Sequence, residues 1–239
     1  MAEHPCILFD LDGTLVSTGG AGNRALDAAF VKLYGIRHAM KDVDPAGKTD
    51  PAIIREIFRA QFGRDCSPDE MRTVQQTYLY QLPLECEKAH DYRVMDGIPG
   101  LLNSLTQRRA VMGLGTGNIE KGARIKLLRG KLNEYLPFGG FGSDSEDRPT
   151  LLTHALAKAE KHTGQKFSRG HVFVVGDTER DIHAAKKAGL KVIAVATGRA
   201  SVDELEAHDP DYCINDFTDN ERFLNIIYNG NGRGKSNDS

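Results

Sequence analysis

The sequence predicts an α/β fold with a parallel sheet at its core and an all-helical segment inserted into it. Short apolar runs, each ended by turn residues, are typical of strands that are buried on both faces of a sheet. Helical patterns separate these runs, as expected for βαβ units. Between residues 17 and 93 the strand pattern is missing and helical spacing takes its place. A second, helical layer is therefore expected there.

Composition narrows the class of protein. The chain has 239 residues, of which 40% are hydrophobic and 27% charged, with a formal net charge of -2. These values are ordinary for a globular protein and give no general attraction for nucleic acid or an anionic membrane. No apolar run has the length of a membrane span, no secretory signal is expected, and four scattered cysteines suggest reduced thiols. We expect a cytoplasmic monomer or homodimer with no nucleic acid and no membrane partner.

The first strand ends in two carboxylates. An apolar run from Cys6 to Phe9 leads directly into Asp10, Asp12 and then Gly13-Thr14. Ligands of open α/β sheets bind at the carboxyl ends of the strands, so these acids are expected to face a site. Carboxylates this close repel each other unless a cation lies between them or they divide one reaction. The alternative is an acidic turn with solvated side chains.

The inserted segment is expected to contain only helices. Ser17 to Gly22 is predicted as a flexible loop, followed by a helix from residue 25 to 33 that ends at a glycine. Asp50 is expected to cap the next helix. A long helix from about residue 67 to 89 should kink or break at Pro83.

The rest of the chain alternates between helix and strand, and residues 229–239 are expected to be disordered because they contain little to bury. The predicted helices are 99–106, 119–128, 149–162, 180–188 and 217–228, and the predicted strands are 110–115, 138–141, 171–176, 192–196 and 212–214.

A second strand end carries a glycine-rich turn, Gly113-Leu-Gly-Thr116-Gly117-Asn118. Thr116 and the amides that open the following helix can hold phosphate oxygens. A dinucleotide-binding turn is the alternative, but Asn118 stands where its third glycine should be.

A cation is expected near the same site. Arg148 precedes Pro149 at a predicted helix start, where backbone amides already favour an anion. Its guanidinium could pair with a nucleophilic aspartate and with the oxygens of a transferring group. Alternatively, it is a surface arginine that neutralises nearby acids, which are Asp144, Glu146 and Asp147.

A third strand end repeats the acidic pattern. The run to Gly176 is followed by Asp177, with Asp181 one helical turn later. Oxygens from Asp10, Asp177 and a backbone carbonyl, completed by water, suit Mg²⁺. Two acid pairs at separate strand ends of one sheet therefore predict a magnesium site.

These four segments resemble, in their usual order, the motifs of the haloacid dehalogenase superfamily. Asp-x-Asp-Gly-Thr near the beginning and Gly-Asp-x-x-x-Asp late in the chain form a specific combination. The chain looks like the phosphoglycolate-phosphatase-like subgroup. Residues 1–16 and 94–228 resemble its Rossmann-like core, and residues 17–93 resemble its helical cap.

The resemblance implies a role for each matching residue. Asp10 would be the nucleophile that forms an aspartyl-phosphate, and Asp12 the general acid and base. Arg148 would stand where the family usually has a lysine. The implied phosphate-binding residues are Thr116, Gly117, Asn118 and Arg148, and the implied Mg²⁺ ligands are Asp10, Asp12, Asp177 and Asp181.

One cap loop, Gly47-Lys48-Thr49-Asp50, resembles the substrate-facing loop of such enzymes. Lys48 would then contact a carboxylate or second phosphate of the substrate. The alternative is an exposed loop lysine.

The sequence thus predicts a Mg²⁺-dependent phosphatase that acts on a small phosphorylated metabolite. A phosphomutase of the same family shares the phosphoenzyme and stays an alternative. A catalytically silent binding protein is the alternative from another class. A dehalogenase is disfavoured because Asp12 and the metal pair would have no role.

Overall fold

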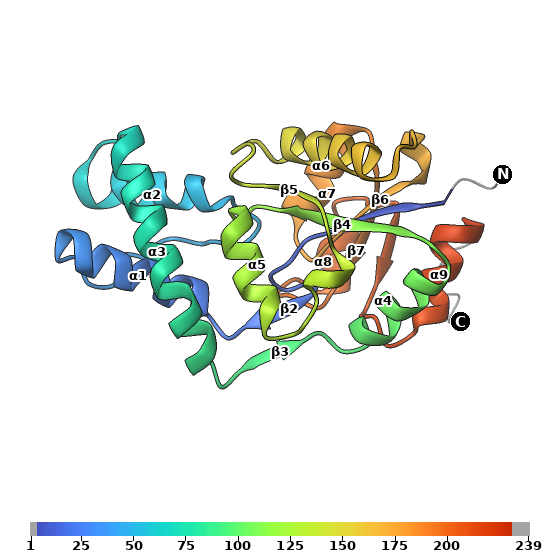
Figure 1. Ribbon diagram of the computed structural model, residues 1–239, viewed down its shortest axis with the longest axis horizontal. Helices are drawn as coiled ribbons and strands as arrows, with labels where there is room; N and C mark the ends of the chain where they lie inside the picture. Colours follow the sequence, from blue (N-terminus) through green and yellow to red (C-terminus); the bar gives the residue numbers. More distant parts are fainter. Residues whose placement is uncertain (1–3, 231–239) are drawn as a thin grey trace.

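A computed structural model of the chain describes residues 4–230 and contains a six-stranded sheet in the order β5-β4-β1-β6-β7-β8 (Figure 1). Every neighbouring pair in it is parallel. Its strands are β1 (Cys6–Phe9), β4 (Val111–Thr116), β5 (Gly139–Phe141), β6 (Val172–Gly176), β7 (Lys191–Val195) and β8 (Tyr212–Ile214). The α/β class with a parallel, Rossmann-like core is therefore confirmed.

Helices lie on both faces of this sheet and in a separate group at the left of Figure 1. The separate group is α1 (Ala21–Tyr34), α2 (Asp50–Phe62) and α3 (Pro68–Lys88). The others are α4 (Ile98–Gln107), α5 (Glu120–Leu128), α6 (Arg148–Thr163), α7 (Glu179–Ala188), α8 (Val202–Glu206) and α9 (Asn220–Asn229), with 3₁₀ turns at Asn133–Tyr135 and Arg169–His171.

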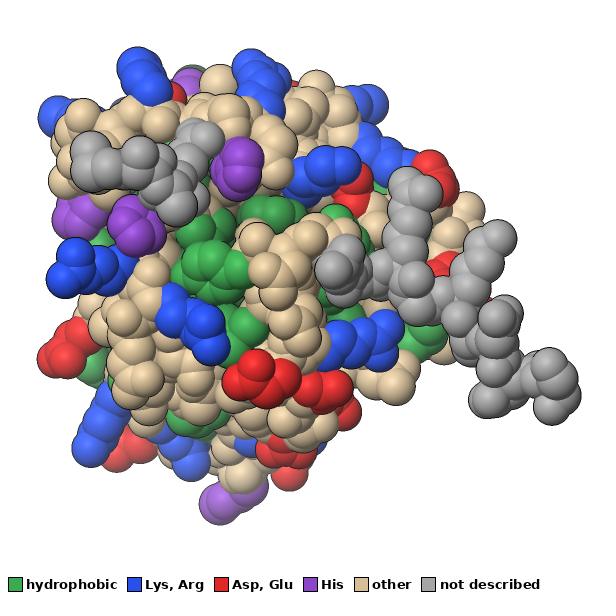
Figure 2. Space-filling model, turned by 90° about the vertical axis from the view of Figure 1, so that its right-hand side faces the viewer, with side chains coloured by type: hydrophobic (Ala, Val, Ile, Leu, Met, Phe, Trp, Pro, Cys, Tyr) green, Lys and Arg blue, Asp and Glu red, His purple; other side chains and the backbone are tan. Residues whose placement is uncertain are grey.

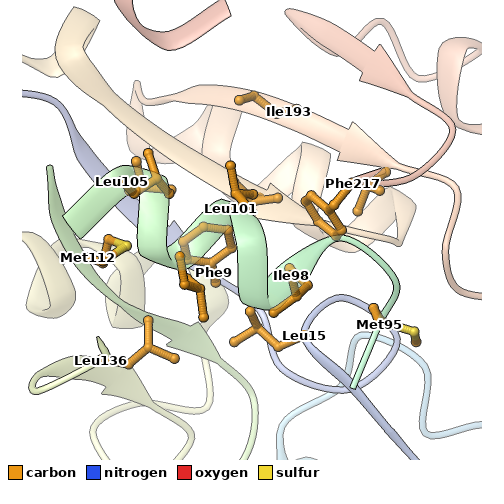
Figure 3. Close-up of a cluster of buried hydrophobic side chains, with 14 of the residues drawn as sticks. Phe9, Leu15, Met95, Ile98, Leu101, Leu105, Met112, Leu136, Ile193 and Phe217 are labelled. Carbon is orange, nitrogen blue, oxygen red and sulfur yellow. The ribbon is translucent and has the colours of Figure 1, made fainter. Parts of the chain in front are cut away.

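The first strand is apolar throughout because both of its faces are covered. Ile7 and Phe9 belong to a core formed with α4 and α9, whereas Cys6 and Leu8 belong to a core formed with α6 and α7. Figure 3 shows Phe9 beside residues of α4 and Phe217 in the first of these cores. Alternate residues of a strand point to opposite faces. Burial on both sides holds β1 firmly and with it the residues that follow.

The three helices of the inserted segment have a core of their own, which includes Phe30, Phe58 and Tyr78. Helix α3 packs along α1, and it continues through Pro83. The expected break at Pro83 is wrong. Leu82 and Cys86 are buried on either side of this proline, and tertiary packing of an apolar face commonly outweighs a local propensity.

The segment that enters and leaves this helical layer is a short antiparallel pair, β2 (Val16–Thr18) and β3 (Tyr92–Val94). The expectation that no strand lies between residues 17 and 93 is wrong. Both strands have a polar centre, Ser17 in β2 and Arg93 in β3, so neither shows the apolar run that identified the strands of the large sheet. The predicted loop from Ser17 to Gly22 is wrong in the same region, since α1 already begins at Ala21.

At the other end of the chain, Asn229 is the last residue of α9 and Gly230 caps the helix with a hydrogen bond from its N–H to Ile226 O, so the expected disorder is wrong for these two residues. Residues 231–239 lie outside the described part. The short helix α8 has no counterpart among the predicted elements.

The face seen in Figure 2 carries both basic and acidic side chains around an apolar area. No single-sign expanse is visible on this face. Among residues 4–230, no helix combines the length and apolar character needed to cross a bilayer.

Candidate functional site

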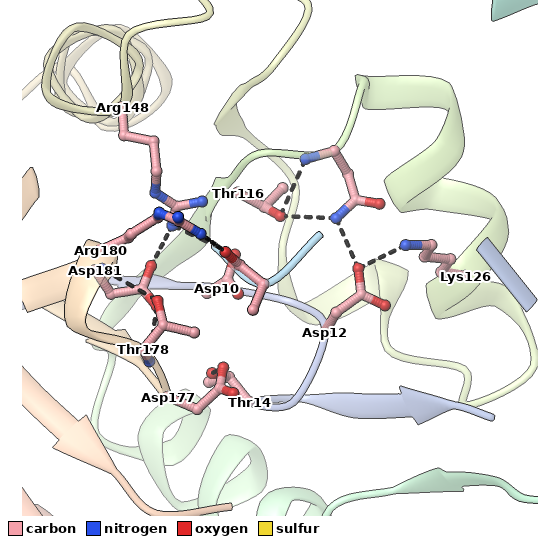
Figure 4. Close-up of polar contacts among 12 residues, drawn as sticks. Asp10, Asp12, Thr14, Thr116, Lys126, Arg148, Asp177, Thr178, Arg180 and Asp181 are labelled. Carbon is pink, nitrogen blue, oxygen red and sulfur yellow. Dashed lines mark hydrogen bonds and ion pairs between the residues drawn. The ribbon is translucent and has the colours of Figure 1, made fainter. Parts of the chain in front are cut away.

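The site lies at the carboxyl ends of β4, β1 and β6, which are three adjacent inner strands of the sheet (Figure 4). From β1 the chain order leads outward to β4 on one side and to β6 on the other. Such a reversal leaves a crevice beside the strand ends, and ligands of open α/β sheets bind there. All three acidic or polar strand ends predicted from the sequence meet in this crevice.

The turn after β1 is shaped by Gly13, which has a φ of 85°. A Cβ atom at this position would overlap the carboxylate of Asp177, so the backbone of the turn approaches that side chain as only glycine allows. Thr14 then donates a hydrogen bond from Oγ1 to Asp177 Oδ1 over 3.0 Å. The first acidic turn is thus built directly against the acid at the end of β6.

Three carboxylates form a buried cluster. Asp10, Asp177 and Asp181 each offer an oxygen within 4.8 Å of the others, and all three are buried. Burial together with the charge of Asp181 raises the pKa of Asp10 to about 7. The same two causes raise the pKa of Asp177 well above its ordinary value. These oxygens could hold a metal ion, whose charge would offset their repulsion.

Arg148 is the cation beside this cluster. Its side chain is 9% exposed, and its guanidinium pairs closely with Asp181 and lies 3.7 Å from Asp10 Oδ1. A surface arginine neutralising nearby acids is therefore the wrong alternative. Two of those acids have other partners, since Asp144 pairs with Lys158 and Glu146 with Arg55.

Asp181 is held by its own helix end as well as by Arg148. Asp181 Oδ2 accepts hydrogen bonds from Thr178 N over 3.1 Å and Thr178 Oγ1 over 2.6 Å, and Arg148 binds Oδ1. Both oxygens of Asp181 therefore already have protein donors. A metal between these acids would meet Asp10 and Asp177 more readily than Asp181.

Asp12 lies in a different environment, although only two residues separate it from Asp10. Its Oδ2 accepts a hydrogen bond from Asn118 Nδ2 over 2.9 Å and forms an ion pair with Lys126 Nζ at 2.5 Å. Asn118 also donates to Thr116 Oγ1 over 3.0 Å. Figure 4 shows Lys126 beside the carboxylate of Asp12.

Lys126 was not predicted from the sequence. It lies in the last turn of α5 and is 114 residues from Asp12 in the chain. Burial alone would lower the pKa of Lys126, but the charges of Asp12 and Asp50 raise it above the ordinary value.

The cap segment docks on the same strand end. Asp50 N donates to Gly117 O over 2.8 Å, and Asp50 Oδ2 accepts from Ile119 N over 2.8 Å. The expectation that Asp50 caps its own helix is wrong. Thr49 is the cap residue of α2, with its side chain accepting from Ala52 N, and the carboxylate of Asp50 serves the start of α5 instead.

A cavity of about 860 Å³ lies between the strand ends and the cap segment. Asp10, Asp12, Arg148 and Lys48 are among the residues that line it. Lys48 Nζ forms an ion pair with Glu56 Oε2 at 2.5 Å. Lys48 is thus at the cavity wall, as the cap-loop prediction requires, with a carboxylate partner from the cap.

Comparison with known proteins identifies the family of this chain and its relatives. Residues 7–195 match the model of the family described as haloacid dehalogenase-like hydrolase. A 5'-nucleotidase of Pseudomonas aeruginosa is 28% identical over 88% of this chain and 91% of its own length. A phosphoglycolate phosphatase of Synechococcus elongatus is 26% identical over 87% of this chain and 91% of its own.

Among solved structures, a hydrolase from Pseudomonas syringae superposes with a TM-score of 0.70 at 20% identity, covering 94% of this chain and 99% of that one. At this identity the likeness supports the fold alone. The prediction of an enzyme that hydrolyses phosphoric monoesters is confirmed by the family match and the curated relatives together. Because the matched residues cover most of the chain, the protein belongs to the haloacid dehalogenase-like hydrolase family.

Proposed function

We propose that this chain is a Mg²⁺-dependent phosphatase that hydrolyses a small phosphorylated metabolite through an aspartyl-phosphate on Asp10. The observation that carries the proposal is the separation of two neighbouring acids. Asp10 lies in the buried carboxylate cluster beside Arg148, whereas Asp12 is paired with Asn118 and Lys126. Pairs of acids in unlike environments are a common basis for dividing nucleophile and acid/base roles.

In the first step, a carboxylate oxygen of Asp10 attacks phosphorus, and the bond from phosphorus to the ester oxygen breaks. Asp12 donates its proton to that oxygen, so the alcohol leaves neutral. In the second step, Asp12 takes a proton from a water molecule while the water oxygen attacks phosphorus. The bond to Asp10 breaks, and inorganic phosphate leaves.

The donor set fits a magnesium ion. Three buried carboxylates face one arginine, which leaves excess negative charge, and hard carboxylate oxygens are the ligands that Mg²⁺ prefers. We assign Asp10, Asp12 and Asp177 as ligands, Asp12 through its backbone, and Asp181 as a ligand through water because its oxygens already have donors. When bound, the ion would neutralise charge on the phosphoryl group and the nucleophile.

The transferring phosphoryl group would be held by Thr116, Gly117, Asn118 and Arg148. Thr116 ends β4, and the backbone of the next two residues leads into the start of α5. Amides at such a helix start favour an anion. Arg148 presents a planar guanidinium from the first residue of α6, where it can contact both Asp10 and phosphate oxygens.

A small substrate is supported by the cavity, whose size is typical of sites for small molecules. Lys48 would contact a second anionic group of that substrate after giving up its pair with Glu56. Residues 17–93 would act as the cap and residues 1–16 with 94–228 as the catalytic core. A cytoplasmic location and a monomeric or homodimeric state stay predictions.

The proposal is tested with Asp10→Asn and a panel of phosphate esters in the presence of Mg²⁺. Wild type should release inorganic phosphate and show an acid-stable, base-labile phosphoenzyme, and the variant should show neither. Asp69→Asn, at an exposed aspartate of α3, is the matched control and should match wild type.

Substantial turnover by Asp10→Asn would remove Asp10 from the role of nucleophile. Conversion of a sugar phosphate into an isomer, without release of phosphate, would identify a phosphomutase instead. Inactivity of wild type toward the whole panel, p-nitrophenyl phosphate and acetyl phosphate included, would favour a binding protein.

A further inference from the structure

Lys126 is a buried cation that the proposed reaction does not yet use. Its side chain is 6% exposed, whereas Lys121 of the same helix is exposed. Figure 4 shows it reaching from α5 to the carboxylate of Asp12. A lysine is seldom this buried unless its charge is paired.

The contacts of Asp12 are uneven between its two oxygens. Lys126 Nζ and Asn118 Nδ2 both bind Oδ2, at 2.5 Å and 2.9 Å. Among residues 4–230, no hydrogen bond is found to Oδ1, and the side chain of Asp12 is 41% exposed at the cavity wall. One oxygen is thus fixed by the protein, and the other is available to the cavity.

The position of Lys126 is enclosed by the cap. A Cβ atom on Gly22, in the first turn of α1, would lie 3.3 Å from Lys126 Nζ, which is tighter than an ordinary contact. The hydroxyl oxygen of Tyr78, in α3, would lie 3.9 Å from that Cβ atom. The small residue at position 22 leaves room for the ammonium group, and the cap helices limit where it can move.

We propose that Lys126 is a positioning residue that fixes Oδ2 of Asp12 so that Oδ1 exchanges the proton with the leaving group and then with water. This inference rests on the proposed function. A general acid must lie within hydrogen-bond reach of the oxygen that it protonates, so an acid that rotates freely is less effective. Two donors on one oxygen define the orientation of the carboxylate without occupying the oxygen that reacts.

The role differs from that of a substrate-binding lysine in its kinetic consequences. A lysine that binds the substrate would mainly affect KM and the affinity for inorganic phosphate. A positioning residue affects the steps in which Asp12 moves a proton, which are departure of the alcohol and attack by water. Departure depends strongly on that proton for an alkyl phosphate and weakly for p-nitrophenyl phosphate, whose leaving group is stable as an anion.

The experiment compares Lys126→Met and Lys126→Arg with wild type by rapid quench in the presence of Mg²⁺. For Lys126→Met, phosphoenzyme formation from an alkyl phosphate should slow by about 100-fold, the loss expected for a misplaced reacting group. Formation from p-nitrophenyl phosphate should slow much less. Hydrolysis of the phosphoenzyme should slow with both substrates, so that the phosphoenzyme accumulates, and Lys126→Arg should recover part of each loss.

Lys121→Met is the matched control because Lys121 is an exposed lysine of the same helix, and its kinetics should equal those of wild type. Inhibition by inorganic phosphate should be the same in Lys126→Met and wild type. If Lys126→Met melts below the assay temperature, Lys126→Gln replaces it, because the glutamine amide is polar but neutral and ends one bond short of the lysine ammonium, and the same preference for the aryl substrate is expected.

Equal losses with the alkyl and aryl substrates, without accumulation of phosphoenzyme, would overturn the positioning role. A higher KM with an unchanged kcat would overturn it in favour of substrate binding. Absence of phosphoenzyme in wild type would instead overturn the proposed function itself, and this inference with it.

Discussion

The buried cap residue Asp50 allows a quantitative test of the electrostatics at the junction between cap and core. The residue is 7% exposed, and its carboxylate accepts a hydrogen bond of 2.8 Å from Ile119 N. Burial raises the pKa of Asp50 from 3.8 to about 6, although Lys126 and the hydrogen bond oppose the increase. Asp50→Asn keeps an acceptor oxygen in the same place and removes the charge.

The magnitude follows from the pKa. Each pKa unit corresponds to about 1.36 kcal/mol, so raising the pKa of Asp50 from 3.8 to about 6 corresponds to roughly 3 kcal/mol. Because the pKa is higher in the folded state, the folded protein binds the proton more tightly. This contribution to stability is fully present below pH 3.8 and is lost as the pH rises through about 6.

The assay is urea denaturation of wild type and Asp50→Asn, without metal, at several values between about pH 4 and about pH 8. The free energy of unfolding of the variant should gain on that of wild type by up to roughly 3 kcal/mol across this interval. Taking the difference between the two proteins cancels the titration of the carboxylate cluster, which both share.

Asp50→Ala is the control, because it removes the acceptor together with the charge. Relative to Asp50→Asn it should be less stable by about 1 to 3 kcal/mol at every pH, since Ile119 N is left without its partner. A difference between wild type and Asp50→Asn that does not change with pH would refute the reasoning.

Two further predictions concern the carboxylate cluster. Without metal, Arg148→Met should lower the free energy of unfolding by about 3 to 5 kcal/mol, because it leaves the buried Asp10 and Asp181 without their cation. In the same denaturation measurement Arg148→Lys should lose less stability, and it should keep some turnover. Equal stability of Arg148→Met and wild type would contradict this prediction. Removal of metal by EDTA should abolish phosphatase activity, and added Mg²⁺ should restore it and raise the melting temperature of wild type. Asp177→Asn should lose most of that increase in melting temperature, whereas an equal increase in both proteins would place the metal elsewhere.

The strand ends of the site were predictable because their information is local. The apolar runs before Asp10 and Asp177 identify buried strands, and the topology of parallel sheets brings their carboxyl ends together. The structure places an oxygen of each acid within 4.8 Å of the other, as these rules require. Strands β2 and β3 were missed because each has a polar residue at its centre, Ser17 and Arg93, in place of an apolar run.

Lys126 and Asp50 could not be assigned from the sequence because their partners are distant in the chain. Lys126 has no signal of its own among the other basic residues of α5, and Asp50 stands where an ordinary helix cap is expected. The folded chain gives Asp50 a partner 69 residues away and gives Lys126 a partner 114 residues away. Contacts of this kind follow from tertiary packing, which no local rule describes.

The position of β1 in the sheet explains why two acids so close in sequence have different surroundings. Strand β1 lies between β4 and β6. The acids that face Asp10 follow β6 and its cation, Arg148, begins α6, whereas the partners of Asp12, which are Asn118 and Lys126, both follow β4. Because the two sets belong to different elements, each can be changed separately. Lys126→Met should therefore leave the Mg²⁺-induced rise in melting temperature as large as in wild type, and loss of that rise would show that the two halves of the site are not independent.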